Sequence, residues 1–234
     1  MKNLVVSGAS RGIGKAIVLH FAKAGWNVAF CSRNVDNLNH LKDACEQLNR
    51  EGRFLGFQCD VSQAGEVKIF AAAAQDFLGS VDVLVNNAGV FLPGQVHEMS
   101  DEDFDSMMQT NVYSAFHLSK ALIPDMKKYR LGHIFNMSSI AGLMAYPNGG
   151  AYNVSKHALT GYSKTLRDEL KAYGIKVTGI YPGAVLTDSW AGVDLPEERF
   201  MSPEDIAQTI WDIHHLSPRT VVEDIVLRPQ LGDI

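Results

Sequence analysis

The stretch Ser7-Gly8-Ala9-Ser10-Arg11-Gly12-Ile13-Gly14 lies between the apolar run 3–7 and a segment with helical spacing. Its glycines leave room for backbone N–H groups to approach a pyrophosphate, and the N-terminus of the following helix attracts negative charge. A tight strand-to-helix connection without a ligand uses glycine as well. Because this turn follows the first strand, we expect it to bind a nucleotide through Ser7, Gly8, Ser10, Arg11, Gly12, Ile13 and Gly14.

Short apolar runs alternate with longer segments of helical spacing along the chain. Such runs are typical of strands buried on both faces of a parallel sheet, and the alternation implies right-handed crossovers with helices on both sides. The pattern predicts a doubly wound α/β fold of three layers (α/β/α). We expect seven parallel strands at 3–7, 27–31, 53–59, 82–86, 133–137, 176–181 and 221–227, with helices at 13–24, 38–49, 64–78, 101–129, 151–172 and 203–214.

No linker, low-complexity tract or internal repeat interrupts this alternation, so residues 1–234 are expected to form one domain. The Pro/Gly-rich stretch 182–196 comes late, after the sixth predicted strand. We expect residues 183–202 to form a short substrate-side flap rather than a domain boundary.

The composition excludes several classes of protein. Of the 234 residues, 46% are hydrophobic, and the net charge of -5 argues against nucleic acid and anionic membranes as partners. We see no signal-peptide pattern and no membrane-spanning run, which predicts a cytoplasmic protein. Cys31, Cys45 and Cys59 form no Cys-x-x-Cys pair, and His214-His215 lacks a metal-binding spacing, so no metal is expected.

Tyr152 and Lys156 stand four residues apart in a predicted helix, so their side chains share one face. A phenol is a poor base at neutral pH, and a neighbouring ammonium is expected to lower its pKa. Alone, such a pair is usually a surface aromatic beside a surface lysine. Ser139 follows a predicted strand and is placed to donate a hydrogen bond to a carbonyl oxygen, whereas Ser138 is interpreted as a strand-end cap.

The residues after the second predicted strand indicate which dinucleotide is bound. A fold of this kind that binds NAD usually has a carboxylate there, roughly 20 residues past the glycine loop. Here the sequence is Cys31-Ser32-Arg33-Asn34, with no carboxylate before Asp36. A guanidinium binds phosphate through two parallel hydrogen bonds, so Arg33 and Arg11 match a 2′-phosphate better than a bare ribose, with Ser32 beside them as a further cofactor contact. Arg33 is also compatible with a solvated loop. We expect NADP(H) to be preferred over NAD(H).

These motifs, together with Asn86-Asn87-Ala88-Gly89, resemble the short-chain dehydrogenase/reductase family from Asn3 to about Thr187. The resemblance implies a Rossmann-like, single-domain enzyme of the NADP(H)-preferring branch. The family motif begins with Thr where this chain has Ser7, which keeps the hydroxyl. Further cofactor contacts implied by the resemblance are Asp60, Val61, Asn87, Ala88, Gly89, Tyr152, Lys156, Pro182, Gly183 and Thr187.

The same resemblance implies a catalytic set. Tyr152 protonates the substrate oxygen, Ser139 steadies that oxygen, and Lys156 binds the nicotinamide ribose and tunes Tyr152. Asn111, in Thr110-Asn111-Val112, holds a water that links the lysine to solvent. The expected reaction interconverts a carbonyl and a primary or secondary alcohol, with the hydride carried by the cofactor.

The substrate is left open by the sequence. A 3-oxoacyl thioester is the first class to consider, ahead of pteridine or sugar carbonyls, but the Asp-Gly-Gly signature common in acyl-carrier-protein ketoreductases is missing after the last strand. A non-catalytic NADP-binding sensor and an epimerase or dehydratase of related fold are the alternatives. Met144, Tyr146 and Trp190 are the expected walls of the substrate pocket.

Association into a homodimer or homotetramer is also expected. The helices predicted at 101–129 and 151–172 carry apolar residues on more than one face, including Phe116, Leu122, Leu159 and Leu166. A sheet covers only one face of a helix, so the surplus suggests contact between subunits, which the resemblance implies as well.

Overall fold

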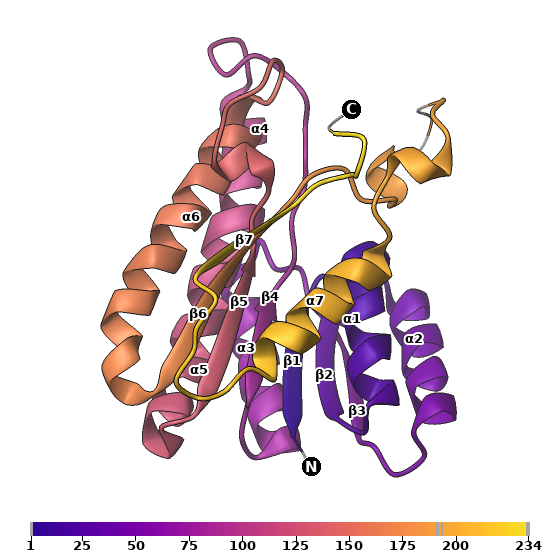
Figure 1. The fold of residues 1–234 in the computed structure, drawn as a ribbon, viewed down its shortest axis with the longest axis vertical. Helices are drawn as coiled ribbons and strands as arrows, with labels where there is room; N and C mark the ends of the chain where they lie inside the picture. Colours follow the sequence, from indigo (N-terminus) through magenta and orange to yellow (C-terminus); the bar gives the residue numbers. More distant parts are fainter. Residues whose placement is uncertain (1, 191, 193, 233–234) are drawn as a thin grey trace.

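A computed structural model describes residues 2–190, 192 and 194–232. Within these residues the strands form one parallel sheet in the order β3-β2-β1-β4-β5-β6-β7, which confirms the predicted topology (Figure 1). The strands are β1 (Asn3–Ser7), β2 (Asn27–Ser32), β3 (Phe54–Gln58), β4 (Val83–Asn86), β5 (Gly132–Met137), β6 (Ile175–Pro182) and β7 (Asp224–Leu227).

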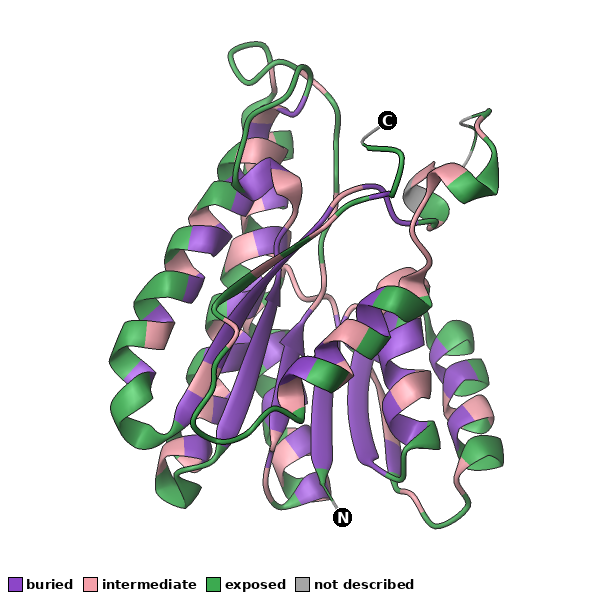
Figure 2. Ribbon diagram, in the orientation of Figure 1, coloured by how far each residue is buried: buried purple, intermediate pink, exposed green. Residues whose placement is uncertain are grey.

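Helices cover both faces of this sheet. One face packs against α1 (Gly12–Lys23), α2 (Val35–Leu48) and α7 (Pro203–His214), which lie in front in Figure 1. The other packs against α3 (Ala64–Leu78), α5 (Ser114–Tyr129) and α6 (Gly150–Leu170). Neighbouring residues of β1 point to opposite layers, since Leu4 and Val6 join the first core and Val5 joins the second. Burial on both faces therefore accounts for the unbroken apolar strands (Figure 2).

The topology places a crevice at one point of the sheet. The chain winds outward from β1 to β2 and β3, then returns to add β4 on the other side of β1 and winds the opposite way. Connections after β1 and β4 therefore leave in opposite directions, and a ligand site is expected beyond the carboxyl ends of these two strands.

The helix predicted over residues 101–129 is helical throughout but not uniformly α-helical. It consists of α4 (Asp101–Met108), a π-helical turn (Gln109–Tyr113) and α5, which follow one another without a gap. The turn coincides with tertiary contacts of Asn111, whose side-chain amide hydrogen-bonds the backbone of Val90 in the loop after β4. Apolar periodicity cannot report such a contact, so the extra residue in the turn could not be predicted from the sequence.

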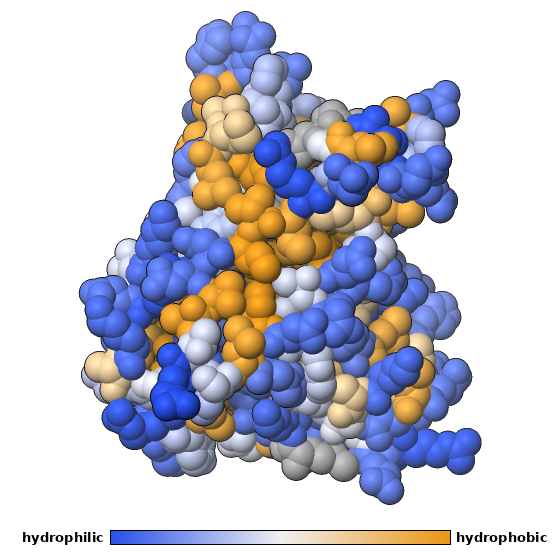
Figure 3. Space-filling model, viewed as in Figure 1, coloured by the Kyte–Doolittle hydropathy of each residue, from blue (hydrophilic) through white to orange (hydrophobic). Residues whose placement is uncertain are grey.

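The apolar residues named on the long helices divide into buried and exposed ones. Leu122, Leu159 and Leu166 are buried within the chain, whereas Phe116 is exposed, as are Tyr113, Tyr129 and Val154 of the same helical segments. The three leucines therefore give no support to association between subunits, and the exposed residues leave that expectation open. On the face in Figure 3, apolar side chains gather in a band where Figure 1 draws β6 and β7, with Val226 of the edge strand half-exposed.

In the part of the chain that the structure describes, we find no helix both long and apolar enough to cross a bilayer.

His133 on β5 is a buried polar residue in this core. Its Nε2 lies 2.9 Å from Thr178 Oγ1, and Thr178 donates its own hydroxyl proton to the Val222 carbonyl at 2.6 Å. Nε2 must then carry the proton that it donates to Thr178. The ring stacks on Phe135 at 3.9 Å, and burial lowers the pKa of His133 to about 2, with the positive charge of neighbouring Lys176 and His214 adding to the effect.

The lowered pKa of His133 predicts that the folded protein loses stability in acid. Its pKa in the folded state is below the unfolded value near 6.5, so its contribution is complete above about pH 6.5 and is lost as the pH falls toward 2. Between pH 7 and pH 5, His133→Leu should lose about 2 kcal/mol less free energy of unfolding than the wild type in urea titrations. Exposed His40→Leu is the control, and equal losses in wild type and His133→Leu would contradict the prediction.

Candidate active site

A cleft of about 1080 Å³ opens at the carboxyl edge of the sheet. It runs from the ends of β1, β2 and β4 to the start of α6 and the segment after β6. The predicted residues that line it are Gly8, Ser10, Arg11, Gly12, Ile13, Ser32, Arg33, Asp60, Val61, Asn87, Ala88, Gly89, Ser139, Met144, Tyr146, Tyr152, Lys156, Pro182, Gly183, Thr187 and Trp190.

Ser7, Gly14 and Asn111 were predicted as site residues but are buried behind the cleft wall. Ser7 Oγ accepts hydrogen bonds from the backbone N–H groups of Asn87 (3.1 Å) and Ala88 (3.2 Å). The hydroxyl that the sequence retains at this position therefore joins the ends of β1 and β4, and its role is to shape the site.

The glycine loop is packed against the end of β4. Gly8 has φ +68°, and a Cβ there would lie 2.7 Å from Ala88 Cα. A Cβ at Gly14 would lie 2.3 Å from the Gly8 carbonyl oxygen and 2.6 Å from Asn87 Nδ2, the same amide nitrogen that donates to that carbonyl at 2.8 Å. Both positions exclude any larger residue for reasons of space, and Gly8 for reasons of backbone conformation as well.

Tyr152, Ser139 and Lys156 converge at the other end of the cleft. The Ser139 hydroxyl lies near the Tyr152 phenol, where it lowers the pKa of that phenol. Lys156 Nζ donates to the Met137 carbonyl at 2.7 Å and lies 5.5 Å from the centroid of the Tyr152 ring. The helical spacing of Tyr152 and Lys156 and the strand end before Ser139 thus place all three side chains on one cleft wall, as the sequence predicted.

The pKa values of Tyr152 and Lys156 differ from what the sequence predicted. Burial raises the pKa of Tyr152, and the nearby Ser139 hydroxyl only partly opposes that rise. Burial also lowers the pKa of Lys156 to about 8. The lysine amine points to a main-chain carbonyl and is itself desolvated, so its effect on the phenol is weaker than the sequence suggested.

Asn111 links three segments around Tyr152 and Lys156. Its Nδ2 donates to the Val90 carbonyl (3.0 Å) and to Ser155 Oγ (2.9 Å), and its Oδ1 accepts from the Val90 N–H (2.7 Å). A Cβ on Gly89 would lie 3.4 Å from Asn111 Oδ1 and 3.5 Å from Lys156 Nζ. Asn111 therefore fixes the loop after β4 against α6 at the level of the lysine.

Ser138 has a different role from its neighbour. It is buried, and its Oγ hydrogen-bonds the Lys156 carbonyl at 3.2 Å and lies 3.3 Å from Thr160 Oγ1. It therefore holds α6 to the end of β5, rather than capping the strand as the sequence suggested.

The opposite end of the cleft is polar. Arg33, Gln58, Asp60 and Glu66 line a recess of about 430 Å³ there. Asn34 caps α2 by accepting from the Asn37 N–H at 2.8 Å, and both asparagines border the cleft. A helix N-terminus and a guanidinium therefore lie side by side at the end of β2, which suits a phosphate group.

Arg11 forms an ion pair that could not be predicted from the sequence. Its Nη1 lies 3.0 Å from Asp188 Oδ2, and both side chains are exposed. A Cβ on Gly12 would lie 3.0 Å from Thr187 Cγ2, so the segment after β6 rests directly on the glycine loop.

That segment contains the flap predicted at 183–202. It forms two 3-10 turns (Asp188–Trp190 and Glu197–Arg199) and is closed at its base by backbone bonds from Leu186 to Met201 (2.9 Å) and from Met201 to Ala184 (3.0 Å). The predicted range also includes residues 191 and 193, which lie outside the described residues.

The cleft beside Tyr152 has an aromatic and aliphatic wall. Met144, Tyr146 and Trp190 line the cleft, and Phe91 meets the Tyr152 ring edge-on at 5.1 Å. Phe91 was missed, although its place soon after a strand end was a usable signal. Other lining residues missed from the sequence are Asn34, Asn37, Cys59, Val90, Thr110, Met137, Ile140, Ala145, Pro147, Ala184, Val185, Asp188 and Arg228.

A doubly wound parallel sheet with a glycine loop at its switch point defines the class of dinucleotide-binding α/β proteins. Within this class the chain belongs to the short chain dehydrogenase family, whose model matches residues 2–198. The chain is similar to a sepiapterin reductase of Chlorobaculum tepidum (35% identity, 99% of this chain and 97% of the relative) and to a 3-oxoacyl-[acyl-carrier-protein] reductase of Staphylococcus epidermidis (33%, 89% of each).

Solved structures agree with this assignment. An alcohol dehydrogenase from Thermococcus sibiricus, complexed with 5-hydroxy-NADP, superposes with a TM-score of 0.91 at 29% identity and covers 100% of this chain and 99% of its own. The L-sorbose reductase from Gluconobacter frateurii, complexed with NADPH and L-sorbose, gives 0.90 at 29% identity, with 97% and 95% covered.

The crowding at Gly14 predicts a specific defect. Gly14→Ala should weaken NADPH binding at least about tenfold, because its Cβ would displace the Gly8 carbonyl and Asn87. Fluorescence titration of NADPH measures the effect. Gly161→Ala is the matched control, since a Cβ at that position meets nothing within 4 Å. Wild-type affinity in Gly14→Ala would refute the assigned geometry of the loop.

Proposed function

We propose that the chain is an NADP(H)-dependent oxidoreductase that interconverts a carbonyl and an alcohol. The observation that supports this most is the convergence of Ser139, Tyr152 and Lys156 at one end of a cleft whose other end holds the glycine loop and Arg33. The spacing of these two ends suits a dinucleotide laid across the switch point.

When bound, NADPH supplies the hydride that reduces the carbonyl carbon. Tyr152 supplies the proton to the substrate oxygen, and a high phenol pKa keeps that proton in place until it is needed. Ser139 donates a hydrogen bond to the same oxygen, where negative charge develops. Lys156 holds the nicotinamide ribose. Asn111 fixes the loop after β4 against α6 beside Lys156, and this position supports the return of a proton to Tyr152. The products are the alcohol and the oxidised cofactor.

We infer that the substrate is a small carbonyl compound with an apolar body. The wall formed by Phe91, Met144, Tyr146 and Trp190 supports this, and the 35% identity to a sepiapterin reductase favours a pteridine carbonyl among such compounds. A 3-oxoacyl thioester is the second candidate, supported by the similarity to a 3-oxoacyl-[acyl-carrier-protein] reductase.

Charge separates the two candidates. The segments 88–110 and 183–202, parts of which line the cleft, carry exposed carboxylates at Glu98, Asp101, Glu102, Asp103, Asp105, Asp188, Asp194, Glu197 and Glu198; of these, Asp188 lines the cleft itself and pairs with Arg11. A negatively charged carrier protein would be repelled by this rim, whereas a free neutral carbonyl compound would not.

Tyr152→Phe tests the chemistry. It removes the proton donor and keeps the ring, so kcat for carbonyl reduction should fall by about 10² to 10⁴ while NADPH still binds. NADPH oxidation is followed against ketones, aldehydes and 3-oxoacyl thioesters, with the exposed Tyr129→Phe as control. A fully active Tyr152→Phe enzyme would rule out the assigned acid. Binding of NADPH by the wild type without turnover of any carbonyl would favour a sensor.

Arg33→Ala tests the cofactor preference. Loss of the guanidinium should lower kcat/KM with NADPH about tenfold or more, because its hydrogen bonds to the charged 2′-phosphate are lost. The value with NADH should stay within about twofold, because NADH has no 2′-phosphate for Arg33 to contact. Exposed Arg50→Ala is the charge-matched control away from the cleft. An equal loss with both cofactors would show that Arg33 does not select for the 2′-phosphate.

A further inference from the structure

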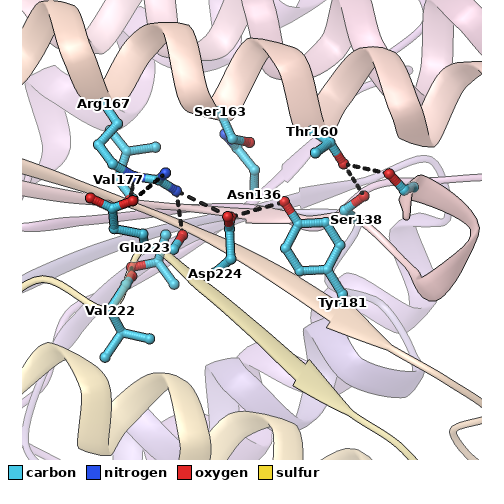
Figure 4. A network of polar contacts seen from close by, with 12 residues as sticks. Asn136, Ser138, Thr160, Ser163, Arg167, Val177, Tyr181, Val222, Glu223 and Asp224 are labelled. Carbon is cyan, nitrogen blue, oxygen red and sulfur yellow. Dashed lines mark hydrogen bonds and ion pairs between the residues drawn. The ribbon is translucent and has the colours of Figure 1, made fainter. Parts of the chain in front are cut away.

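Helix α6 is attached to the sheet far from the cleft through Arg167. This residue follows Lys156 by about three helical turns on the same helix. Its guanidinium is largely buried, and its nitrogens donate to the Val177 carbonyl (3.0 Å), to Glu223 Oε2 (3.3 Å), to the Glu223 carbonyl and to Asp224 Oδ1 (3.2 Å) (Figure 4). One planar group thus joins α6 to both β6 and the start of β7.

Asp224 receives a second donor from β6. Tyr181 has no exposed surface, and its hydroxyl donates to Asp224 Oδ1 at 2.9 Å (Figure 4). Burial raises the pKa of Tyr181 to about 12, which keeps the hydroxyl protonated as a donor at neutral pH. The same carboxylate oxygen therefore binds Arg167 from the helix and Tyr181 from the strand.

Gly179 provides the space for this contact. A Cβ at Gly179 would lie 2.7 Å from the Tyr181 hydroxyl oxygen and 2.8 Å from Asp224 Oδ1. Gly179 pairs with Asp224 across β6 and β7, and Tyr181 lies on the same face of the strand two residues later. The Tyr181 side chain folds back over the glycine to reach Asp224, which only a residue without a side chain permits.

A second attachment holds the catalytic end of α6. Thr160 Oγ1 donates to the Lys156 carbonyl (2.9 Å) and lies 3.3 Å from the Gly142 carbonyl in the loop after Ser139. Thr160 also lies near the Tyr181 side chain and moderates the rise in the pKa of that tyrosine (Figure 4). Tyr181 consequently lies between the two attachments of the helix.

Tyr181 is also one residue from the cleft wall. Pro182 and Gly183 line the cleft, and the Pro182 carbonyl oxygen lies 3.5 Å from Ser139 Oγ. A shift of the Tyr181 ring is therefore transmitted to the backbone beside Ser139, while its links to Thr160 and Asp224 transmit it to α6. Tyr181 itself is not part of the cleft wall.

We propose that Tyr181 and Asp224 are positioning residues for hydride transfer: together with Arg167 and Thr160 they set the place of α6 relative to the ends of β5 and β6. This inference rests on the proposed roles of Ser139, Tyr152 and Lys156. The glycine loop and Arg33 follow β1 and β2, on the other side of the switch point, so the phosphate-binding part of the cleft is remote from this pair. The pair acts mainly on the rate of the chemical step and leaves the contacts to the cofactor phosphates unchanged.

Tyr181→Phe and Asp224→Ala test this inference. Each should lower kcat by about five- to tenfold, because displacement of reacting groups by a fraction of an ångström slows transfer, and each should leave the KM for NADPH within about twofold. The primary deuterium isotope effect with NADPH labelled at the transferred hydride should rise. The double variant should be no slower than the slower single variant, since Asp224→Ala already removes the hydrogen bond that Tyr181→Phe removes. Exposed Tyr173→Phe is the control.

Three outcomes would overturn the inference: an unchanged kcat in Tyr181→Phe, additive losses in the double variant, or a parallel loss of kcat, NADPH affinity and thermal stability. If Asp224→Ala does not fold, Tyr181→Phe decides the matter alone, because it removes a single oxygen atom outside the cleft. Tyr152→Phe in the same assay separates the two proposals: if it is inactive while Tyr181→Phe is fully active, the positioning role alone fails. If Tyr152→Phe is active, the proposed function fails.

Discussion

Close approach of backbone to backbone at the ends of β1 and β4 is the constraint on which this site depends. At Gly8 the chain passes so near Ala88 that a single methyl group would lie 2.7 Å from a main-chain carbon, and at Gly14 one would meet a carbonyl oxygen at 2.3 Å. The Ser7 hydroxyl joins the same two strand ends. The tightness of this junction leaves N–H groups facing a crevice where the two halves of the sheet diverge.

A second constraint is the burial of polar groups around the catalytic helix. Lys156 and Asn111 have almost no exposed surface, and each is satisfied mainly by main-chain atoms, of Met137 and Val90 respectively. Because desolvation disfavours charge, the phenol of Tyr152 is a weaker acid and Lys156 a weaker base than in water. A phenol that keeps its proton in the free enzyme suits the proposed reaction, in which one proton and one hydride are transferred.

The sequence predicted those features of the structure that depend on a single strand, helix or turn. All seven strands were predicted within a few residues, because a parallel sheet buried on both faces requires continuous apolar runs. The glycine loop and the Tyr152–Lys156 spacing likewise belong to single elements. Predictions were incomplete where distant elements meet: the π-helical turn at Asn111 coincides with its contacts to Val90, and Leu122, Leu159 and Leu166 are buried within the chain.

Taken by itself, the sequence determined the order of strands and helices, the place of the crevice and the identity of most side chains around it, since these follow from periodicity, glycine spacing and the rules of parallel sheets. Tertiary structure decided the partners of those side chains: Asp188 for Arg11, the α6 backbone for Ser138, and Asp224 for Tyr181. These contacts join residues far apart in the chain, and burial, which sets the pKa of each catalytic group, arises only when the layers pack together.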